Sequence, residues 1–126
     1  MSKNNLISIL LLLFLISSCD NKLINDECKK GEKNYKQDEF SIIMTKKPYK
    51  KWYNHFEGKS LQTGLDTVFK SEGRWYEKFD DYVKIGDTLT KTKGNLFIEI
   101  HTIDTVYISE WTCKGVLING VSIKDK

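Results

Sequence analysis

The sequence predicts a mainly β domain, a small β-barrel or sandwich of about 6–7 short strands that follows an N-terminal signal helix and a tether. Apolar and polar residues alternate over Leu96–Ile103 and again over Thr105–Trp111, as they do in half-buried strands. Turn-forming Gly, Asn and Asp residues separate the apolar runs. The chain has 126 residues, of which 40% are hydrophobic and 29% are charged, and this composition is typical of one globular domain.

Residues 1–18 predict a lipoprotein signal peptide. Lys3 precedes the apolar stretch Leu6–Ile16, which as a helix would span about 16 Å, half of a hydrocarbon core. Such a stretch is too short for a membrane span and is typical of a signal peptide. The run Leu15–Cys19 resembles the lipobox of bacterial lipoproteins, which implies that Cys19 is lipidated and becomes the new N-terminus. The alternative is an ordinary cleaved signal followed by an incidental cysteine.

Residues 19–34 are predicted to form a lipidated tether, and residues 35–126 a single β-rich domain. Large apolar side chains are rare between Asp20 and Gln37, and a polar segment of this kind is typical of a linker. Removing Lys3 from the 20 basic side chains leaves 19 against 17 acidic ones, a net charge of +2. This near balance argues against a nucleic-acid binder, which usually has a strong basic excess.

The first half of the domain shows one clear strand and several ambiguous segments. Phe40–Met44 is a short apolar run that predicts a strand. Pro48, which has no backbone N–H to donate to a neighbouring strand, fits just after its end. Lys46–Thr63 has no clean periodicity, and we expect a loop there. Leu65–Lys70 predicts a strand, whereas the apolar spacing of Arg74–Tyr82 fits either a helix or a strand.

The second half has a stronger β pattern. Gly-Asp, Lys-Gly and Asn-Gly turns divide it into short segments of alternating polarity, and the last turn indicates a terminal hairpin. The predicted strands are Tyr82–Ile85, Thr88–Lys91, Leu96–Ile103, Thr105–Trp111, Val116–Ile118 and Val121–Ile123.

Lipidation of Cys19 would leave Cys28 and Cys113 as an even pair in an oxidising extracytoplasmic compartment. A disulfide between them would close a loop of about 85 residues and stabilise the fold by about 4–5 kcal/mol in the chain-entropy model. The alternative is two free thiols, because the sequence does not show whether their Cα atoms come within bridging distance.

Residues 82–95, with the sequence YVKIGDTLTKTKGN, resemble a recurrent stretch in uncharacterised small lipoproteins of Bacteroidota. Lys46–His55 resembles a Lys/Tyr-rich segment of the same proteins that ends in Asn-His. The resemblance implies a cell-envelope location and adds no activity. Some surface lipoproteins of that group have a Lys and paired acidic residues after the lipidated Cys, and Asp20–Leu23 does not match them. We therefore expect an outer-membrane anchor that faces the periplasm.

The residues that could support catalysis form no recognisable motif. His55 and His101 are the only histidines, and their spacing fits no zinc or metalloprotease signature. Asp80 and Asp81 are adjacent and would point to opposite faces of a strand, which is a poor acid/base arrangement. Nucleophile elbows, phosphate-binding loops and EF-hand loops do not occur. We expect no enzyme activity, no metal and no cofactor.

One basic and aromatic patch combines Lys46, Lys47, Lys50 and Lys51 with Trp52 and two flanking tyrosines. It could contact anionic lipid, with lysines near the surface and aromatic rings at the headgroup level. It could equally bind an acidic glycan or a protein. The alternative is a solvated loop in which lysine stems cover aromatic rings.

Thr67, Thr88 and Thr105 each stand between an Asp and an apolar residue. These triplets resemble the sites at which exported Bacteroidota proteins can be O-glycosylated. The alternative is ordinary β chemistry, in which Asp caps a turn and Thr begins a strand.

Together these observations predict a membrane-anchored cell-envelope lipoprotein that acts as a non-catalytic binding or assembly module. Its partners would be the lipid bilayer, through Cys19, and an envelope protein or glycan. One alternative is a small extracytoplasmic hydrolase or inhibitor with a site built from loop residues such as His55. A second is a purely structural envelope component.

Overall fold

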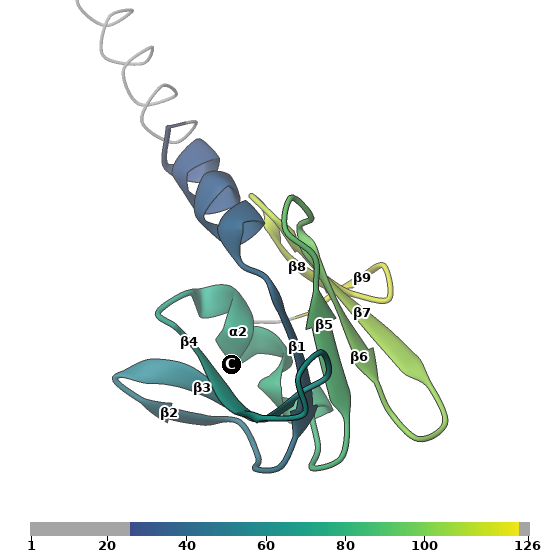
Figure 1. Cartoon of the computed structure of the whole chain (residues 1–126). Coiled ribbons are helices and arrows are strands. Elements are labelled where there is room, and N and C mark those ends of the chain that lie inside the picture. Colours follow the sequence, from purple (N-terminus) through teal and green to yellow (C-terminus); the bar gives the residue numbers. More distant parts are fainter. Residues whose placement is uncertain (1–25, 124–126) are drawn as a thin grey trace, which may run out of the picture.

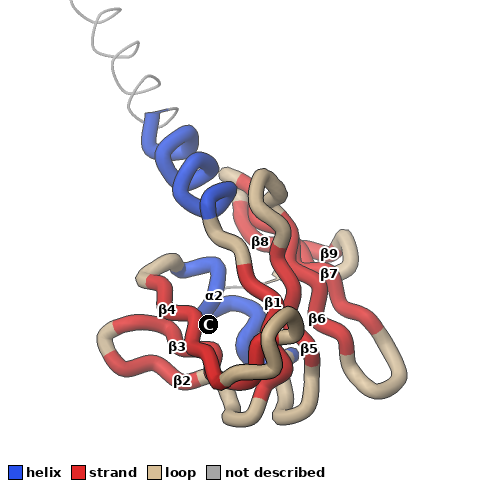
Figure 2. Tube along the Cα trace, in the orientation of Figure 1, coloured by secondary structure: helices blue, strands red, loops and turns tan. Residues whose placement is uncertain are grey.

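A computed structural model describes residues 26–123, which form one helix, a nine-stranded antiparallel sheet and two short helices between strands (Figures 1 and 2). The mainly β class is confirmed, with nine strands in place of the expected 6–7. The strands are β1 (Phe40–Met44), β2 (Tyr49–Lys51), β3 (Tyr53–Ser60), β4 (Asp66–Ser71), β5 (Thr88–Lys91), β6 (Phe97–His101), β7 (Val106–Thr112), β8 (Gly115–Ile118) and β9 (Val121–Ser122).

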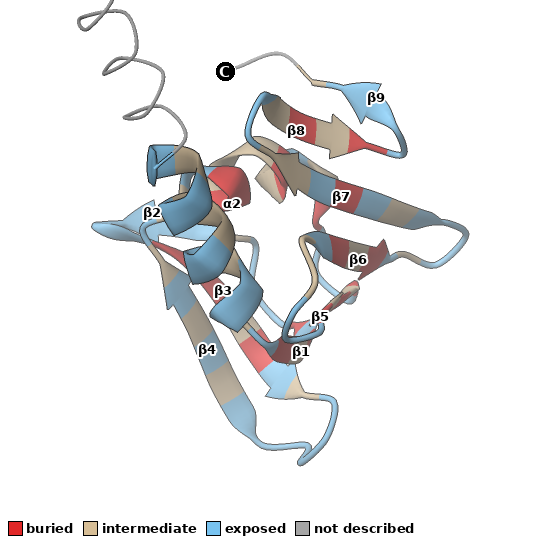
Figure 3. Ribbon diagram, turned by 90° about the horizontal axis from the view of Figure 1, so that it is seen from above, coloured by how far each residue is buried: buried red, intermediate tan, exposed pale blue. Residues whose placement is uncertain are grey.

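The sheet is strongly curved. Its order is β2-β3-β1-β5-β6-β7-β8-β9, and β4 pairs with the other edge of β3. Seen from above, the strands wrap around the helix α2 (Arg74–Phe79), which lies on the concave side (Figure 3). Within residues 26–123 no pairing joins β4 to β8 or β9, so the sheet curls toward a barrel and stays open. The outer face of the curve is solvated, as is usual for an antiparallel sheet.

The core fills the concave side. Alternate residues of β1 and β6, such as Ile42 and Ile100, point inward and are buried. Helix α2 adds Trp75, Tyr76 and Phe79, whose spacing places all three on its sheet-facing side. This burial settles the ambiguous segment 74–82 as a helix followed by the 3₁₀ turn η1 (Asp80–Tyr82). The side chains gather into one aromatic-rich cluster, as expected for a single domain.

The segment predicted as a tether is helical over residues 26–37 and docked on the domain. Cys28 and Cys113 lie at disulfide distance, with Cα atoms 5.6 Å apart. The ring of Tyr35 lies 5.1 Å from Trp75 and 5.2 Å from Trp111. The sequence did not indicate this helix because Tyr35 is its only large apolar side chain. Cys19 lies outside the described residues, and its lipidation and the domain boundary at residue 35 stay predictions.

Two further expectations were wrong. The segment 46–63 is not a loop, because it contains β2 and the eight-residue strand β3. Residues 82–85 are not a strand, because they belong to η1 and a turn that Asp87 closes by accepting a hydrogen bond from the Lys84 amide at 2.8 Å. Gly86, at φ 94°, takes the left-handed conformation that this turn requires. The other predicted strands are confirmed to within two residues at each end.

Candidate binding face on the β2–β3 hairpin

The β2–β3 hairpin projects from one side of the molecule (Figure 1). β2 pairs with the first residues of β3, so that Tyr49 lies opposite His55 and Lys51 opposite Tyr53. Trp52 is the single residue between the two strands. Its φ of 67° is in the left-handed region, which glycine adopts freely and bulky residues avoid. Its side chain is 88% exposed and makes no core contact.

The two sides of this hairpin have different surroundings. One side faces α2, where Asn54 Nδ2 donates to the carbonyl of Gly73 at 3.1 Å and Lys50 forms an ion pair with Glu77. The other side belongs to the outer face of the curved sheet. Tyr49 and Tyr53 lie there, 39% and 43% exposed. Alternation along β2 and β3 therefore gives the hairpin one side fixed to the domain and one side open to solvent.

The ring of Tyr49 is held flat on the open side. It stacks on His55 with ring centroids 4.5 Å apart and an interplanar angle of 8°. His55 is oriented by its Nδ1, which lies 2.7 Å from the carbonyl oxygen of Tyr53. The Tyr49 hydroxyl donates to the carboxylate of Glu57, which also pairs with Lys46 at 3.2 Å. One face of the Tyr49 ring thus packs on His55, while Tyr49 stays 39% exposed on the open side.

This contact also changes the acidity of both partners. The hydrogen bond to a carboxylate raises the pKa of Tyr49 above that of an ordinary tyrosine. The same hydrogen bond, with the nearby Lys46 ammonium, lowers the pKa of Glu57. Both shifts favour a protonated Tyr49 and an ionised Glu57 at neutral pH.

The lysines of the predicted patch fall into two groups. Lys46 and Lys50 are neutralised by ion pairs with Glu57 and Glu77. Lys47 and Lys51 are exposed, and neither has an ion pair with any residue in the described part of the chain. Lys70 of β4, the register partner of His55, is also exposed and has no ion pair with any described residue. The open side therefore has a local excess of positive charge, and contact of Lys46, Lys47, Lys50, Lys51 and Trp52 with a membrane stays a prediction.

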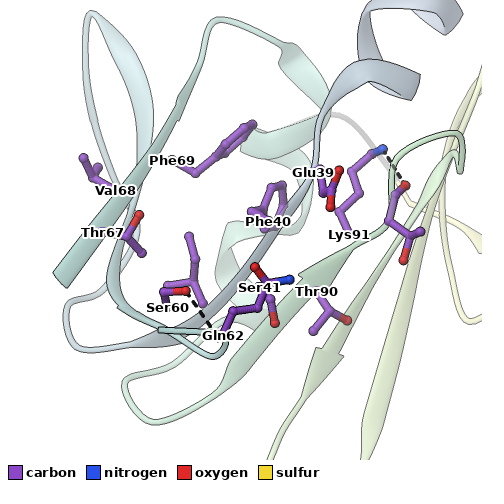
Figure 4. Close-up of a pocket in the computed structure, with 12 residues that line it drawn as sticks. Glu39, Phe40, Ser41, Ser60, Gln62, Thr67, Val68, Phe69, Thr90 and Lys91 are labelled. Atoms are coloured by element: carbon purple, nitrogen blue, oxygen red, sulfur yellow. Dashed lines mark hydrogen bonds between the residues drawn. The ribbon is translucent and has the colours of Figure 1, made fainter. Parts of the chain in front are cut away.

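A groove on the concave side is a second place where a ligand could bind (Figure 4). It has a volume of about 620 Å³ and lies between β4 and the β1–β5 pair. The rings of Phe40 and Phe69, 4.4 Å apart, contribute to its apolar lining together with Ile42 and Val68. The residues that line the polar rim include Ser41, Ser60, Gln62, Thr67 and Thr90.

Among the described residues that line this groove Lys91 is the one cation, and it is only 3% exposed. Its ammonium donates to the carbonyl oxygens of Asp38 at 2.9 Å and Thr92 at 3.4 Å. Burial lowers the pKa of Lys91, with partial compensation from the nearby carboxylates of Asp38 and Glu39. The Lys91 ammonium thus bonds to backbone carbonyls, and its role is structural.

The two histidines do not come together. His55 is buried beneath Tyr49, whereas His101 lies on the outer face of β6 with Nε2 2.9 Å from Glu99 Oε2. Across residues 26–123 no group of three or more His, Cys, Asp or Glu side chains is arranged to hold a metal ion. Asp80 and Asp81 lie in the 3₁₀ turn η1.

The three Asp-Thr sites differ in accessibility. Thr105 is exposed in the β6–β7 turn, where its amide donates to Thr102 Oγ1 at 3.1 Å. Thr67 and Thr88 are half-buried, and Thr67 lines the groove on the concave side. Thr105 is therefore the most accessible of the three, and glycosylation at Thr67, Thr88 and Thr105 stays a prediction.

The sequence analysis missed Lys70 and the support that His55 and Glu57 give to Tyr49. A strand assignment for 53–60 would have found them, since alternation then places residues 49, 51, 53, 55 and 57 on one face.

None of the helices in the described part of the chain is long and apolar enough to span a membrane. Comparisons of the chain with protein-family models, curated proteins and solved structures gave no match.

Proposed function

We propose that this protein is a lipid-anchored cell-envelope protein that acts as a non-catalytic binding module, and that it binds its partner through the open side of the β2–β3 hairpin. The observation that carries the proposal is Trp52. A side chain of this size at 88% exposure gains nothing from the core of its own domain. Large aromatic residues dominate the energy of binding surfaces, which gives such exposure a function.

The backbone at Trp52 supports the same conclusion. A left-handed conformation costs an L-residue roughly 1–2 kcal/mol compared with the right-handed region, and glycine avoids that cost. Backbone strain of this kind concentrates at functional sites. Trp52 thus gains no stability from burial and adds strain to the backbone, and a binding role accounts for both features.

The position of the hairpin is compatible with an anchor at the N-terminal end. The helix of residues 26–37 extends from one end of the molecule, and the hairpin projects from the side (Figure 1). A disulfide between Cys28 and Cys113, whose Cα atoms lie 5.6 Å apart, would fix that helix to the β7–β8 turn. A domain attached through this helix would leave the hairpin accessible.

The anchor is tested by intact mass of the protein purified from its native membrane, beside a Cys19→Ala variant. We expect a diacyl- or triacyl-cysteine mass at Cys19 and its loss in the variant. A soluble, unlipidated chain with a different N-terminus would refute the anchor.

The binding role is tested by placing a photo-crosslinking residue at position 52 in living cells. The matched control is the same residue at position 103, because Ile103 is also exposed and belongs to the β6–β7 turn, which lies on the other side of the molecule from the hairpin (Figure 1). We expect a discrete adduct from position 52 and none from position 103. Equal labelling at both positions, or no adduct at either, would refute a binding face on the hairpin.

A further inference from the structure

We infer that the hairpin face binds an acidic polysaccharide, whose sugar rings stack on Tyr49 and Tyr53 while its carboxylates meet Lys47, Lys51 and Lys70. This inference rests on the proposed binding function and names the chemistry of the partner. It depends on two independent features of the face, its flat ring and its unneutralised lysines.

The Tyr49 ring has the geometry of a stacking platform. It lies parallel to the His55 ring at an angle of 8°, and its hydroxyl is bonded to Glu57. These contacts fix the ring before any ligand arrives, so binding does not have to order it. A pyranose ring presents an apolar face of C–H groups, and that face matches the exposed side of a flat aromatic ring. Tyr53, next along the same face, and Trp52 at the turn extend the platform.

The positive charge around the Tyr49 ring favours an anionic ligand. Lys47, Lys51 and Lys70 have no ion pair within residues 26–123. The carboxylate of Glu57, which lies beside the ring, already accepts from the Tyr49 hydroxyl and pairs with Lys46. A chain of sugar acids repeats its carboxylates along its length, and it can therefore meet several separated ammonium groups at once.

The shape of the face favours a glycan over a bilayer. Contact with a bilayer requires several apolar groups that reach the same depth beyond the backbone. Here Trp52 is 88% exposed, whereas Tyr53 is 43% exposed and the Tyr49 ring lies flat against His55. A flat face with lysines at its edges fits a ligand that lies along the strands.

The test uses the full lipidated protein in neutral phosphatidylcholine nanodiscs, titrated with polygalacturonate or hyaluronate, with neutral dextran as the control polymer. We expect saturable binding of at least one acidic polymer, a blue shift of Trp52 emission, weaker binding at high salt, and no response to dextran. Trp52→Phe should remove the blue shift and identify its source.

Four variants locate the site. Tyr49→Ala should weaken binding at least tenfold, whereas Tyr49→Phe, which keeps the ring, should retain most of it. Lys51→Gln should weaken binding severalfold. Lys59→Gln is the matched control, because Lys59 is exposed on β3 but already pairs with Asp66 at 2.9 Å, and its binding should be unchanged. Circular dichroism and melting confirm that each variant is folded.

Three results would overturn the inference: no binding of either acidic polymer, equal binding by wild type and Tyr49→Ala, or tighter binding to phosphatidylglycerol vesicles than to either polymer. A discrete photo-adduct at position 52 together with any of these results would keep the binding function and reject the polysaccharide. Loss of the photo-adduct as well would reject both.

Discussion

Trp75 and Trp52 are the same residue type in two regions with opposite burial. Trp75 is 1% exposed on α2, and its indole N–H donates to Ser109 Oγ at 2.8 Å. Trp52 is 88% exposed on the hairpin, in a backbone conformation that suits glycine. Trp75 is buried with its indole N–H hydrogen-bonded, as expected of a core tryptophan, whereas Trp52 is not buried. The difference shows that the aromatic residues of this chain, 12% of the sequence, are divided between the core and the exposed surface, where we propose a role in recognition.

The region around Trp75 is where distant segments converge. Tyr35 of the N-terminal helix packs on Trp75, and Gly73 lies so close to the Tyr35 ring that an added Cβ would come within 2.6 Å of it. Cys28 of the same helix lies at disulfide distance from Cys113 in the β7–β8 turn. Contacts of such large sequence separation stabilise the fold only when the whole domain is assembled.

The tip of the hairpin, β2 and Trp52, lies at the edge of the sheet, whereas the rest of β3 pairs with β4 and β1 and buries Phe56. Asn54 and Lys50 connect the hairpin to α2, while the stack of Tyr49 on His55 is internal to the hairpin. We therefore expect substitutions on its open side to change binding and to leave the fold intact.

The largest stability effect should come from the disulfide. Cys28→Ser with Cys113→Ser, or reduction of the wild type, should lower the free energy of unfolding by about 4–5 kcal/mol, because the bridge closes a loop of 85 residues. Denaturant unfolding with and without reductant measures this. A reduced protein with an unchanged midpoint would show that the two cysteines are not bridged.

Trp75→Ala should lower the free energy of unfolding by about 3–5 kcal/mol, because it opens a cavity in the aromatic cluster. It also leaves the buried Ser109 hydroxyl without its donor. Trp75→Phe keeps most of the apolar volume and should cost less. Thermal or denaturant unfolding measures both, and a cost below 1 kcal/mol for the alanine variant would contradict the assignment of this region as the core.

Tyr76→Phe should lower the free energy of unfolding at neutral pH by about 1–3 kcal/mol, since it leaves the Asp38 carboxylate without the donor that it has in the wild type. Burial, reinforced by Asp38, raises the pKa of Tyr76 well above the ordinary tyrosine value. A raised folded-state pKa contributes stability that is fully present below the unfolded value of about 10 and is lost as the pH rises above it.

The difference in stability between wild type and Tyr76→Phe should accordingly shrink above about pH 10. Denaturant unfolding at several alkaline pH values measures this difference. Lys91, which also lies near Asp38, is present in both proteins and does not enter the comparison. A difference that stays constant or grows above pH 10 would contradict the hydrogen bond.

The smallest effect, of opposite sign, is expected at the hairpin turn. Trp52→Gly should raise the free energy of unfolding by about 0.5–1 kcal/mol, because relief of the left-handed strain exceeds the entropy cost of glycine. Trp52→Ala, which keeps the strain, is the matched control and should change stability by less than about 0.5 kcal/mol.

Elements with local signals were predictable from the sequence. β1 and β5 have β-branched or alternating residues, and the β8–β9 hairpin has Asn119 and Gly120 at φ 50° and 82°, the turn that Asn-Gly favours. β3 was missed because Asn54 and His55 are polar and buried, which removes the alternation. Their hydrogen bonds to backbone carbonyls make that burial possible.

The candidate site was predictable only in part, because its composition is local in the sequence but its ion pairs depend on tertiary structure. The composition of residues 46–52 indicated a basic and aromatic patch. Which lysines are neutralised depends on Glu57 and Glu77, and the second of these lies 27 residues from Lys50. Such pairing depends on tertiary structure, so a local pattern does not contain it.

Thermal melting of wild type and Trp52→Gly, each with and without polygalacturonate, tests the central claim most directly, because a ligand that binds only the folded state raises its melting temperature. We predict that the variant melts at or above the wild-type temperature without ligand. We also predict that the ligand raises the melting temperature of the wild type and shifts that of the variant much less. A variant that melts lower than the wild type, or that shifts equally with ligand, would contradict the claim that Trp52 serves binding and not folding.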